Sequence, residues 1–152
     1  MFDTSGFEGN EEEILIDSIV KDSQYRSVFR KFDRFNAMQT ILVQQILNES
    51  YNMVIAAPTG SGKTLVHELA ICRHLKEQEQ LRRAPGKSKV LFIAPTKALC
   101  QQRLEEWLKF STIFHIKIVE CTGDRSPAEM LKELTNASII ITTPEKWDSI
   151  TR

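Results

Sequence analysis

The chain has few cysteines, and neither its cysteines nor its histidines show a spacing that is typical of a metal site. The three cysteines are scattered, and no Cys-x-x-Cys pair is present. The cysteines are Cys72, Cys100 and Cys121, and the histidines are His67, His74 and His115. We therefore expect no structural zinc in this segment, and an odd, scattered cysteine count is typical of a reducing compartment.

The chain also lacks a net charge, a signal peptide and a membrane-spanning run. Its 20 Lys and Arg residues match its 20 Asp and Glu residues, which excludes strong charge steering by the whole molecule but not a local basic groove. No N-terminal apolar stretch resembles a secretory signal, and no apolar run is long enough to cross a bilayer. We expect an intracellular, soluble protein with no membrane partner.

The length of 152 residues fits one domain with a substantial core. Residues 1–22 form an acidic segment that includes the run Glu11-Glu12-Glu13, and a short acidic run is usually solvated. We expect this segment to be flexible or to form an adaptor helix, and we expect residues 23–152 to form the folded domain.

Short apolar runs rich in Ile and Val predict buried parallel strands at residues 52–57, 89–94, 116–120 and 138–142. Helical patterns lie at residues 37–49, 63–82, 96–110 and 127–134. Strands that alternate with helices predict an α/β fold, with a parallel sheet and helices on both faces. Trp107 and Trp147 lie in predicted helices among aliphatic residues, which favours core packing over base stacking.

The most informative motif joins the first predicted strand to the helix that follows it. The motif reads Ala57-Pro58-Thr59-Gly60-Ser61-Gly62-Lys63-Thr64. A strand, a glycine loop and a helix form a phosphate cradle, because glycine lets successive N–H groups face an anion and the helix start adds its positive dipole end. In such a cradle Lys63 reaches the β- and γ-phosphates of ATP, and the Thr64 hydroxyl holds Mg²⁺. An ordinary strand–helix turn would also use glycine, but it would not account for Lys followed by Thr.

Further motifs follow the three later predicted strands, at the end of the sheet where ligands of open parallel sheets bind. They are Ala94-Pro95-Thr96-Lys97-Ala98-Leu99, Cys121-Thr122-Gly123-Asp124-Arg125 and Thr142-Thr143-Pro144-Glu145-Lys146-Trp147-Asp148. Helix starts with Thr and Lys suit contacts with a phosphate backbone, and a row of them suits a single-stranded nucleic acid. Each motif also has a plain structural interpretation, since Thr96 would cap a helix, Thr143-Pro144 would begin one and Gly123-Asp124 would form a turn.

In this order the motifs resemble those of the first RecA-like domain of superfamily 2 helicases, over residues 32–152. Residues 57–64 resemble the phosphate loop of that superfamily, in which Ala replaces the first Gly of the general pattern. Residues 94–99 with Gln102 and Arg103 resemble motif Ia, residues 122–124 resemble motif Ib, and residues 142–148 resemble the next motif that contacts nucleic acid. The resemblance implies nucleic-acid contacts at Pro95, Thr96, Lys97, Arg103, Thr122, Gly123, Asp124, Thr143, Pro144, Glu145 and Lys146.

The amino-acid sequences of two motifs narrow the resemblance to a subgroup of these helicases. Residues 144–148 and Lys97-Ala98-Leu99-Cys100 are most similar to the Ski-like helicases, and among them to the meiotic crossover DNA helicases of the Mer/Hfm type. This resemblance implies a nuclear DNA helicase that uses ATP and Mg²⁺ and acts on single-stranded or branched DNA. A Ski-like RNA helicase stays open as an alternative, because these motifs contact phosphate and sugar rather than bases.

Upstream, Phe35-Asn36-Ala37-Met38-Gln39 resembles the adenine-reading Q element of these helicases. A Gln amide can accept from the adenine amino group and donate to N7 at the same time. Phe32 or Phe35 would then pack against the purine. Apart from the resemblance, Gln39 is an ordinary helix residue and both Phe residues are candidates for the core.

One expected part of the helicase site is missing. The resemblance implies an Asp-Glu pair at the end of an apolar strand, for Mg²⁺ and the attacking water, but no apolar strand of this chain ends in Asp-Glu. The second RecA-like domain is missing too. We therefore expect an incomplete first lobe that does not turn ATP over alone, with marginal stability and with residues 52–57 deprived of neighbouring strands. A module that binds nucleotide without hydrolysing it stays open as well.

Overall fold

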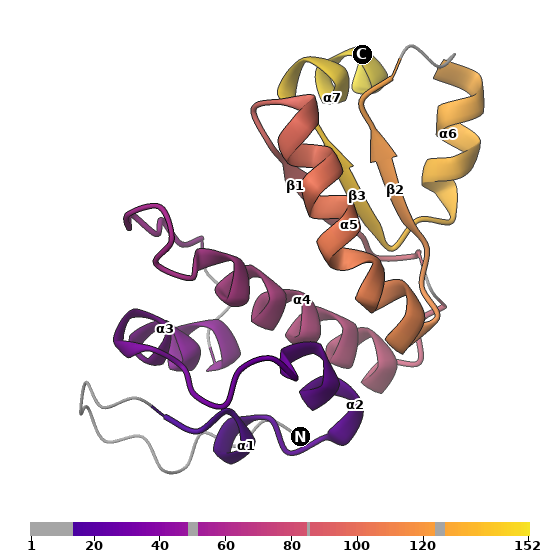
Figure 1. Cartoon of the computed structure of the whole chain (residues 1–152). Coiled ribbons are helices and arrows are strands. Elements are labelled where there is room, and N and C mark those ends of the chain that lie inside the picture. Colours follow the sequence, from indigo (N-terminus) through magenta and orange to yellow (C-terminus); the bar gives the residue numbers. More distant parts are fainter. Residues whose placement is uncertain (1–13, 49–51, 85, 124–126) are drawn as a thin grey trace. The chain divides into compact units, whose positions relative to one another are not determined.

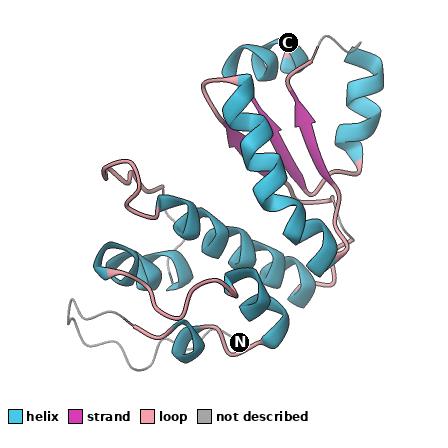
Figure 2. Cartoon of the chain, in the orientation of Figure 1, coloured by secondary structure: helices cyan, strands magenta, loops and turns pink. Residues whose placement is uncertain are grey.

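The computed structural model describes residues 14–48, 52–84, 86–123 and 127–152. The chain divides into two compact units, residues 1–77 and residues 78–152 (Figure 1). The described part of the first unit is built of helices and loops, and the second holds a three-stranded sheet with helices (Figure 2). Within the described ranges, none of the helices combines the length and the apolar character that a bilayer-spanning helix requires.

The first unit begins with the short elements α1 (Ile16–Ile19), α2 (Ser23–Arg26) and η1 (Ser27–Phe29). Backbone hydrogen bonds tie this region to the chain before α3 (Ala37–Asn48), from Ile16 N to Asp33 O at 2.9 Å and from Phe35 N to Ile14 O at 2.8 Å. The Ile16 side chain is fully buried. Residues 14–22 are therefore packed, which differs from the flexible segment expected at 1–22, because their apolar side chains enter the core. Residues 1–13 lie outside the described residues.

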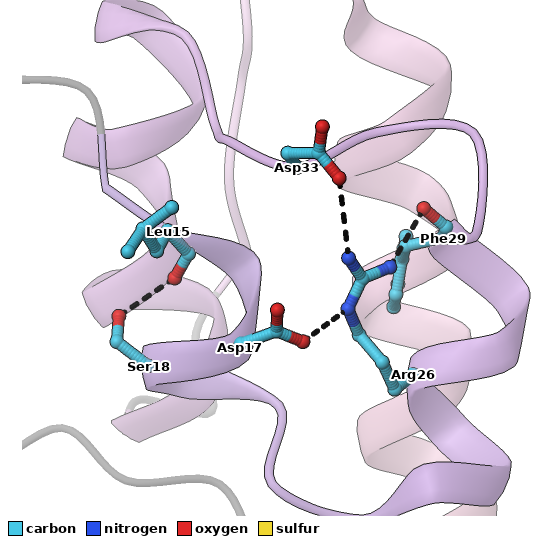
Figure 3. Close-up of polar contacts among 6 residues, drawn as sticks. All are labelled: Leu15, Asp17, Ser18, Arg26, Phe29 and Asp33. Carbon is cyan, nitrogen blue, oxygen red and sulfur yellow. Dashed lines mark hydrogen bonds and ion pairs between the residues drawn. The ribbon is translucent and has the colours of Figure 1, made fainter.

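Arg26 connects three parts of this N-terminal region (Figure 3). Its Nε donates to the Asp17 carboxylate at 2.5 Å, one Nη donates to the Phe29 carbonyl at 2.9 Å, and the other Nη lies 3.8 Å from the Asp33 carboxylate. The Asp17 side chain is 70% exposed and the Asp33 side chain 94%. Water therefore screens both ion pairs, and each contributes at most about 1 kcal/mol.

Asp22 links α2 to α4 (Lys63–Gln80). Its carboxylate accepts from the N–H groups of Gln24 at 3.0 Å and Tyr25 at 3.4 Å, and from Lys76 Nζ at 3.2 Å. Burial alone would raise the pKa of Asp22, but these donors together hold the pKa below its usual value. One carboxylate thus caps α2 and joins it to α4.

The main helices of the first unit are α3 (Ala37–Asn48) and α4, which lie where the sequence predicts them. The strand predicted at 52–57 is wrong, since no strand is assigned there and the Val54 side chain is 95% exposed. A strand requires a hydrogen-bonded neighbour. Within the described part of the chain, the paired strands are elsewhere and none of them pairs with residues 52–57.

The second unit holds the strands β1 (Val90–Ile93), β2 (Ile118–Cys121) and β3 (Ile139–Thr142), in the order β1-β3-β2. Both pairings are parallel. The helices are α5 (Lys97–Phe114), α6 (Pro127–Thr135) and α7 (Pro144–Thr151). All of β3 is buried, as expected for the central strand of a parallel sheet that is covered on both faces. The three later strands and the α/β class therefore agree with the sequence prediction.

Helices cover both faces of this sheet. On one face Phe92 of β1 packs edge-on against Trp107 of α5, with ring centroids 5.1 Å apart. On the other face Val119 and Ile140 form a core with side chains of α6, and Trp147 of α7 packs against it. Trp107 is only 1% exposed. Both tryptophans are thus packing residues, as their sequence context predicts.

Candidate functional site

The loop at residues 57–64 has the backbone that its glycines allow. Gly60 has a φ of +82° and Gly62 a φ of +86°, values that side chains disfavour. Within the loop Ser61 N donates to Pro58 O at 3.3 Å, and Leu65 N donates to Gly62 O at 3.1 Å at the start of α4. The loop therefore turns tightly into the helix, so that its N–H groups and the first turn of α4 are close together.

Lys63 and Thr64 are the first two residues of α4. Lys63 folds back over the loop, where its Nζ donates to Ala57 O at 2.5 Å and to Pro58 O at 2.6 Å. The ammonium is thus held by two carbonyl dipoles. Ser61 Oγ lies buried in the same loop, and no described group is hydrogen-bonded to it.

Two amide side chains of the first unit hold the loop from outside. Asn36 Nδ2 donates to Ser61 O at 3.0 Å, and Gln39 Nε2 donates to Gly62 O at 3.0 Å. Gln39 was a candidate from the resemblance, whereas sequence reasoning assigned Asn36 no role. The signal for Asn36 was present in the sequence, because Asn followed three residues later by Gln is the pattern of a capped helix start.

The two aromatic candidates for the base lie in different surroundings. Phe35 is fully buried, whereas Phe32 is 47% exposed. In this structure Phe35 has no free surface for a purine, because it belongs to the core of the first unit. Of the two aromatic side chains, Phe32 alone has surface for stacking.

A cavity of about 490 Å³ lies in the first unit between residues 53–55 and one side of α4. Met53, Ile55, Val66 and Ala70 make its wall apolar, and Lys63 stands at it with several polar side chains of α4. Met53 and Ile55 are half-buried at this cavity, although no described strand pairs with them, whereas Val54 between them points into solvent.

The motifs of the second unit meet at one edge of its sheet (Figure 1). Ile93, Cys121 and Thr142 are in register at the carboxyl ends of the three strands. The next residues are therefore the motifs, namely Pro95, Thr96, Lys97, Thr122, Gly123, Thr143, Pro144, Glu145 and Lys146. Because α5 and α7 begin directly after β1 and β3, both helix starts also lie at this edge. Asp124 lies outside the described residues.

Hydrogen bonds already occupy part of this edge. Thr96 is the N-cap of α5, and its hydroxyl accepts from Leu99 N at 3.3 Å. Thr122 Oγ1 donates to the Glu120 carboxylate at 2.6 Å. Thr143 is the N-cap residue of α7 and is only 7% exposed. The capping role of Thr96 is thus present, and it leaves the neighbouring Lys97 exposed.

Arg103 lies further along α5 and interacts with other side chains of the second unit. Its guanidinium pairs with Glu106 at 2.5 Å and lies 5.5 Å from the centroid of the Phe92 ring and 5.3 Å from that of Trp107. The Arg103 side chain is 15% exposed. In this structure the Arg103 guanidinium is therefore engaged with Glu106 and the two rings.

Among the described residues near this edge, Cys100 has a shifted pKa. Burial raises the pKa of the Cys100 thiol, the N–H···S contact with Ala94 lowers it, and the charge of Glu120 raises it further. Cys100 therefore stays a protonated, buried thiol at neutral pH. Across the described ranges, no group of three or more His, Cys, Asp or Glu side chains is arranged to hold a metal ion.

Comparisons with known proteins all find helicases. The family model for DEAD/DEAH box helicases matches residues 36–152. The probable ATP-dependent DNA helicase HFM1 of Mus musculus is 44% identical over 131 residues, which are 86% of this chain and 9% of that protein. The ATP-dependent DNA helicase MER3 of Saccharomyces cerevisiae is 41% identical over 138 residues, which are 91% of this chain and 11% of that protein.

A solved structure shows the same fold. The DEAD-box helicase Mss116 bound to ssRNA and UDP-BeF superimposes with a TM-score of 0.75 at 24% identity, over 91% of this chain and 30% of that chain. The shares given for HFM1 and MER3 mean that the chain spans about a tenth of the length of these two proteins.

Proposed function

The chain belongs to the DEAD/DEAH box helicase family, and we propose that it is the nucleotide-binding part of an ATP-dependent DNA helicase. The observation that carries this proposal is the loop at residues 57–64, where the Lys63 ammonium lies against the carbonyls of Ala57 and Pro58. Carbonyl dipoles carry only partial charge, so a phosphate that reaches the loop is a stronger partner for the ammonium.

The loop residues fit the phosphates of ATP. A Cβ at Gly60 would meet nothing within 4 Å, so the backbone there is open to a ligand. The buried hydroxyl of Ser61 has no partner among the described groups, and the first turn of α4 supplies unpaired N–H groups. Lys63 would neutralise the phosphate charge, and the Thr64 hydroxyl would hold Mg²⁺.

Adenine would be read by Gln39. Its Oε1 accepts from Asn36 N at 2.9 Å and its Nε2 donates to Gly62 O at 3.0 Å. An amide oxygen has a second lone pair and an amide nitrogen a second hydrogen, so Gln39 can hold the loop and pair with a base edge together. Phe32 is the aromatic side chain with exposed surface for stacking on the purine.

The edge formed by the motifs after β1, β2 and β3 would bind the backbone of a single strand. Two helix starts and the side chains of Lys97 and Lys146 at this edge favour phosphate. HFM1 and MER3 are named as DNA helicases, which favours DNA as the nucleic acid. We propose single-stranded or branched DNA and a nuclear, meiotic role, as the resemblance of the motifs implies. Arg103 would first have to leave Glu106 and two rings to reach such a strand.

RNA is the second candidate substrate. In its solved structure the helicase Mss116 is bound to single-stranded RNA, and phosphate contacts do not distinguish DNA from RNA. Competition between a DNA and an RNA oligonucleotide of matched sequence would decide between the two.

Within its 152 residues the chain has no apolar strand that ends in an Asp-Glu pair. That pair would position Mg²⁺ and the attacking water. We therefore propose that this chain binds ATP without turning it over, and that hydrolysis and unwinding require the further parts of a longer helicase. ATP turnover by the chain that Lys63→Ala abolishes would contradict this.

Equilibrium titration of the chain with Mg-ATP, and with a fluorescent DNA oligonucleotide, tests the proposal. Lys63→Ala should weaken ATP at least about tenfold, because it removes a charge-assisted hydrogen bond, and should leave DNA affinity unchanged. Lys97→Ala is the matched control, since it removes one Lys from the other candidate site. It should weaken DNA and leave ATP affinity unchanged. No saturable ATP binding by the wild-type chain would contradict the proposal.

A further inference from the structure

Asn36 stands directly before α3 and belongs to two hydrogen-bond networks. Its Oδ1 accepts from Gln39 N at 2.9 Å, while its own backbone N–H donates to Gln39 Oε1 at 2.9 Å. This reciprocal pair caps the start of α3. The same two side chains then use their Nδ2 and Nε2 atoms on the carbonyls of Ser61 and Gly62, both at 3.0 Å.

The cap alone does not require asparagine. An N-cap needs only an acceptor, and Ser, Thr or Asp would serve α3 about equally well. An amide has an acceptor and a donor in one side chain. Asn36 uses the acceptor on its own helix and the donor on the loop, 25 residues further along the chain. The second contact is therefore the specific one.

The direction of each held carbonyl also fixes the direction of the N–H group in the same peptide unit. The carbonyl of Ser61 shares a planar peptide unit with the N–H of Gly62, and the carbonyl of Gly62 shares one with the N–H of Lys63. In a trans peptide the carbonyl and the N–H point in opposite directions, and the described chain contains no cis peptide bond. Holding the two carbonyls toward α3 therefore turns both N–H groups away from α3.

We propose that Asn36 is a positioning residue for phosphate binding: it holds the Ser61 carbonyl so that the N–H of Gly62 faces the phosphates of a bound nucleotide. This inference rests on the proposed function and extends it to a residue outside the loop. Gln39 does the same for the N–H of Lys63 through Gly62 O, and it also reads the base. Asn36 acts on the phosphates alone.

The test compares Asn36→Ser with the wild-type chain in titrations with Mg-ATP and Mg-GTP. Serine keeps the cap but is too short to reach Ser61 O. We expect the affinity for both nucleotides to fall by the same factor, about fivefold, which corresponds to one ordinary hydrogen bond. Gln39→Ala should instead weaken ATP more than GTP. Asn36→Asp should weaken both nucleotides further than Asn36→Ser, because it keeps the cap but sets a carboxylate against a carbonyl and near phosphate.

A stability control separates positioning from folding. Asp22→Ala removes the cap of α2 in the same unit, away from the loop, and should leave nucleotide affinity unchanged at a comparable loss of stability. Wild-type affinity in Asn36→Ser would overturn the inference while leaving ATP binding in place. An equal loss of affinity in Asp22→Ala, or a loss for ATP alone in Asn36→Ser, would also overturn it. Absence of ATP binding in the wild-type chain would overturn both the inference and the proposed function.

Discussion

Replacing Gly62 by alanine tests how closely the phosphate loop is held against α3. A Cβ at Gly62 would stand less than 3.0 Å from Gln39 Nε2 and 3.3 Å from Asn36 Nδ2, on a backbone with a φ of +86°. Gly60 supplies the matched control, because its φ is +82° but a Cβ there would meet nothing within 4 Å. The two variants share the backbone strain, and only one displaces Gln39.

The two costs can be estimated separately. A side chain at positive φ costs about 1–2 kcal/mol at either position. At Gly62 the Gln39 amide must also move, and it then loses the hydrogen bond to Gly62 O from a side chain that is only 5% exposed, at a further cost of about 1–3 kcal/mol. We expect Gly60→Ala to lower the free energy of unfolding by about 1–2 kcal/mol, and Gly62→Ala by about 2–5 kcal/mol.

Urea unfolding of the chain followed by circular dichroism measures this difference. Trp107 and Trp147 both lie in the second unit, so tryptophan fluorescence follows that unit separately and should be the same in both variants. In a Gln39→Ala background the extra cost of Gly62→Ala should disappear, because the atom that it displaces is gone. Equal costs for the two glycine variants, or an extra cost that survives in Gln39→Ala, would refute the reasoning.

Side chains outside the loop give further tests. The pKa of Asp22 lies below its usual value in the folded chain. This carboxylate therefore stabilises the fold above its unfolded pKa of about 3.9, and that stability is lost as the pH falls through the lower folded pKa. In Asp22→Asn the free energy of unfolding should therefore fall less steeply as the pH is lowered into the acid range. Thr96→Ala should cost about 1 kcal/mol by removing the cap of α5, and Thr96→Ser should restore most of it; equal melting curves for the two would contradict the capping role. Arg103→Ala should lower the unfolding midpoint of the second unit by tryptophan fluorescence, through about 0.5–2 kcal/mol of lost stacking on Phe92 and Trp107. Lys97→Ala removes the same charge from an exposed position and should leave that midpoint unchanged.

Local patterns in the sequence predicted the elements that depend on local contacts. The alternation of Ile-rich runs with helical patterns located β1, β2 and β3, and the central run of β3 is buried as its composition indicates. The phosphate loop was visible because glycine, lysine and threonine each have a chemical reason for their position. Helix capping by Thr96 also follows from residue type alone.

Contacts between distant residues were harder to predict. Residues 52–57 have the composition of a strand, but a strand also requires a partner, and composition does not say whether one pairs with it. Residues 1–22 were expected to be flexible or to form an adaptor helix because of their acidic run, whereas Ile16 is buried and its N–H is hydrogen-bonded to the Asp33 carbonyl. Phe35 was a candidate for the base, yet the sequence does not show which of two neighbouring Phe side chains faces the core.

Amide hydrogen exchange at residues 57–64, with and without Mg-ATP, tests the central claim most directly. If the loop N–H groups wrap the phosphates, saturating Mg-ATP should slow exchange at Gly60, Gly62 and Lys63. In Lys63→Ala the slowing at Gly60 and Gly62 should require at least about tenfold more Mg-ATP. Exchange that Mg-ATP leaves unchanged in the wild-type loop would contradict the account.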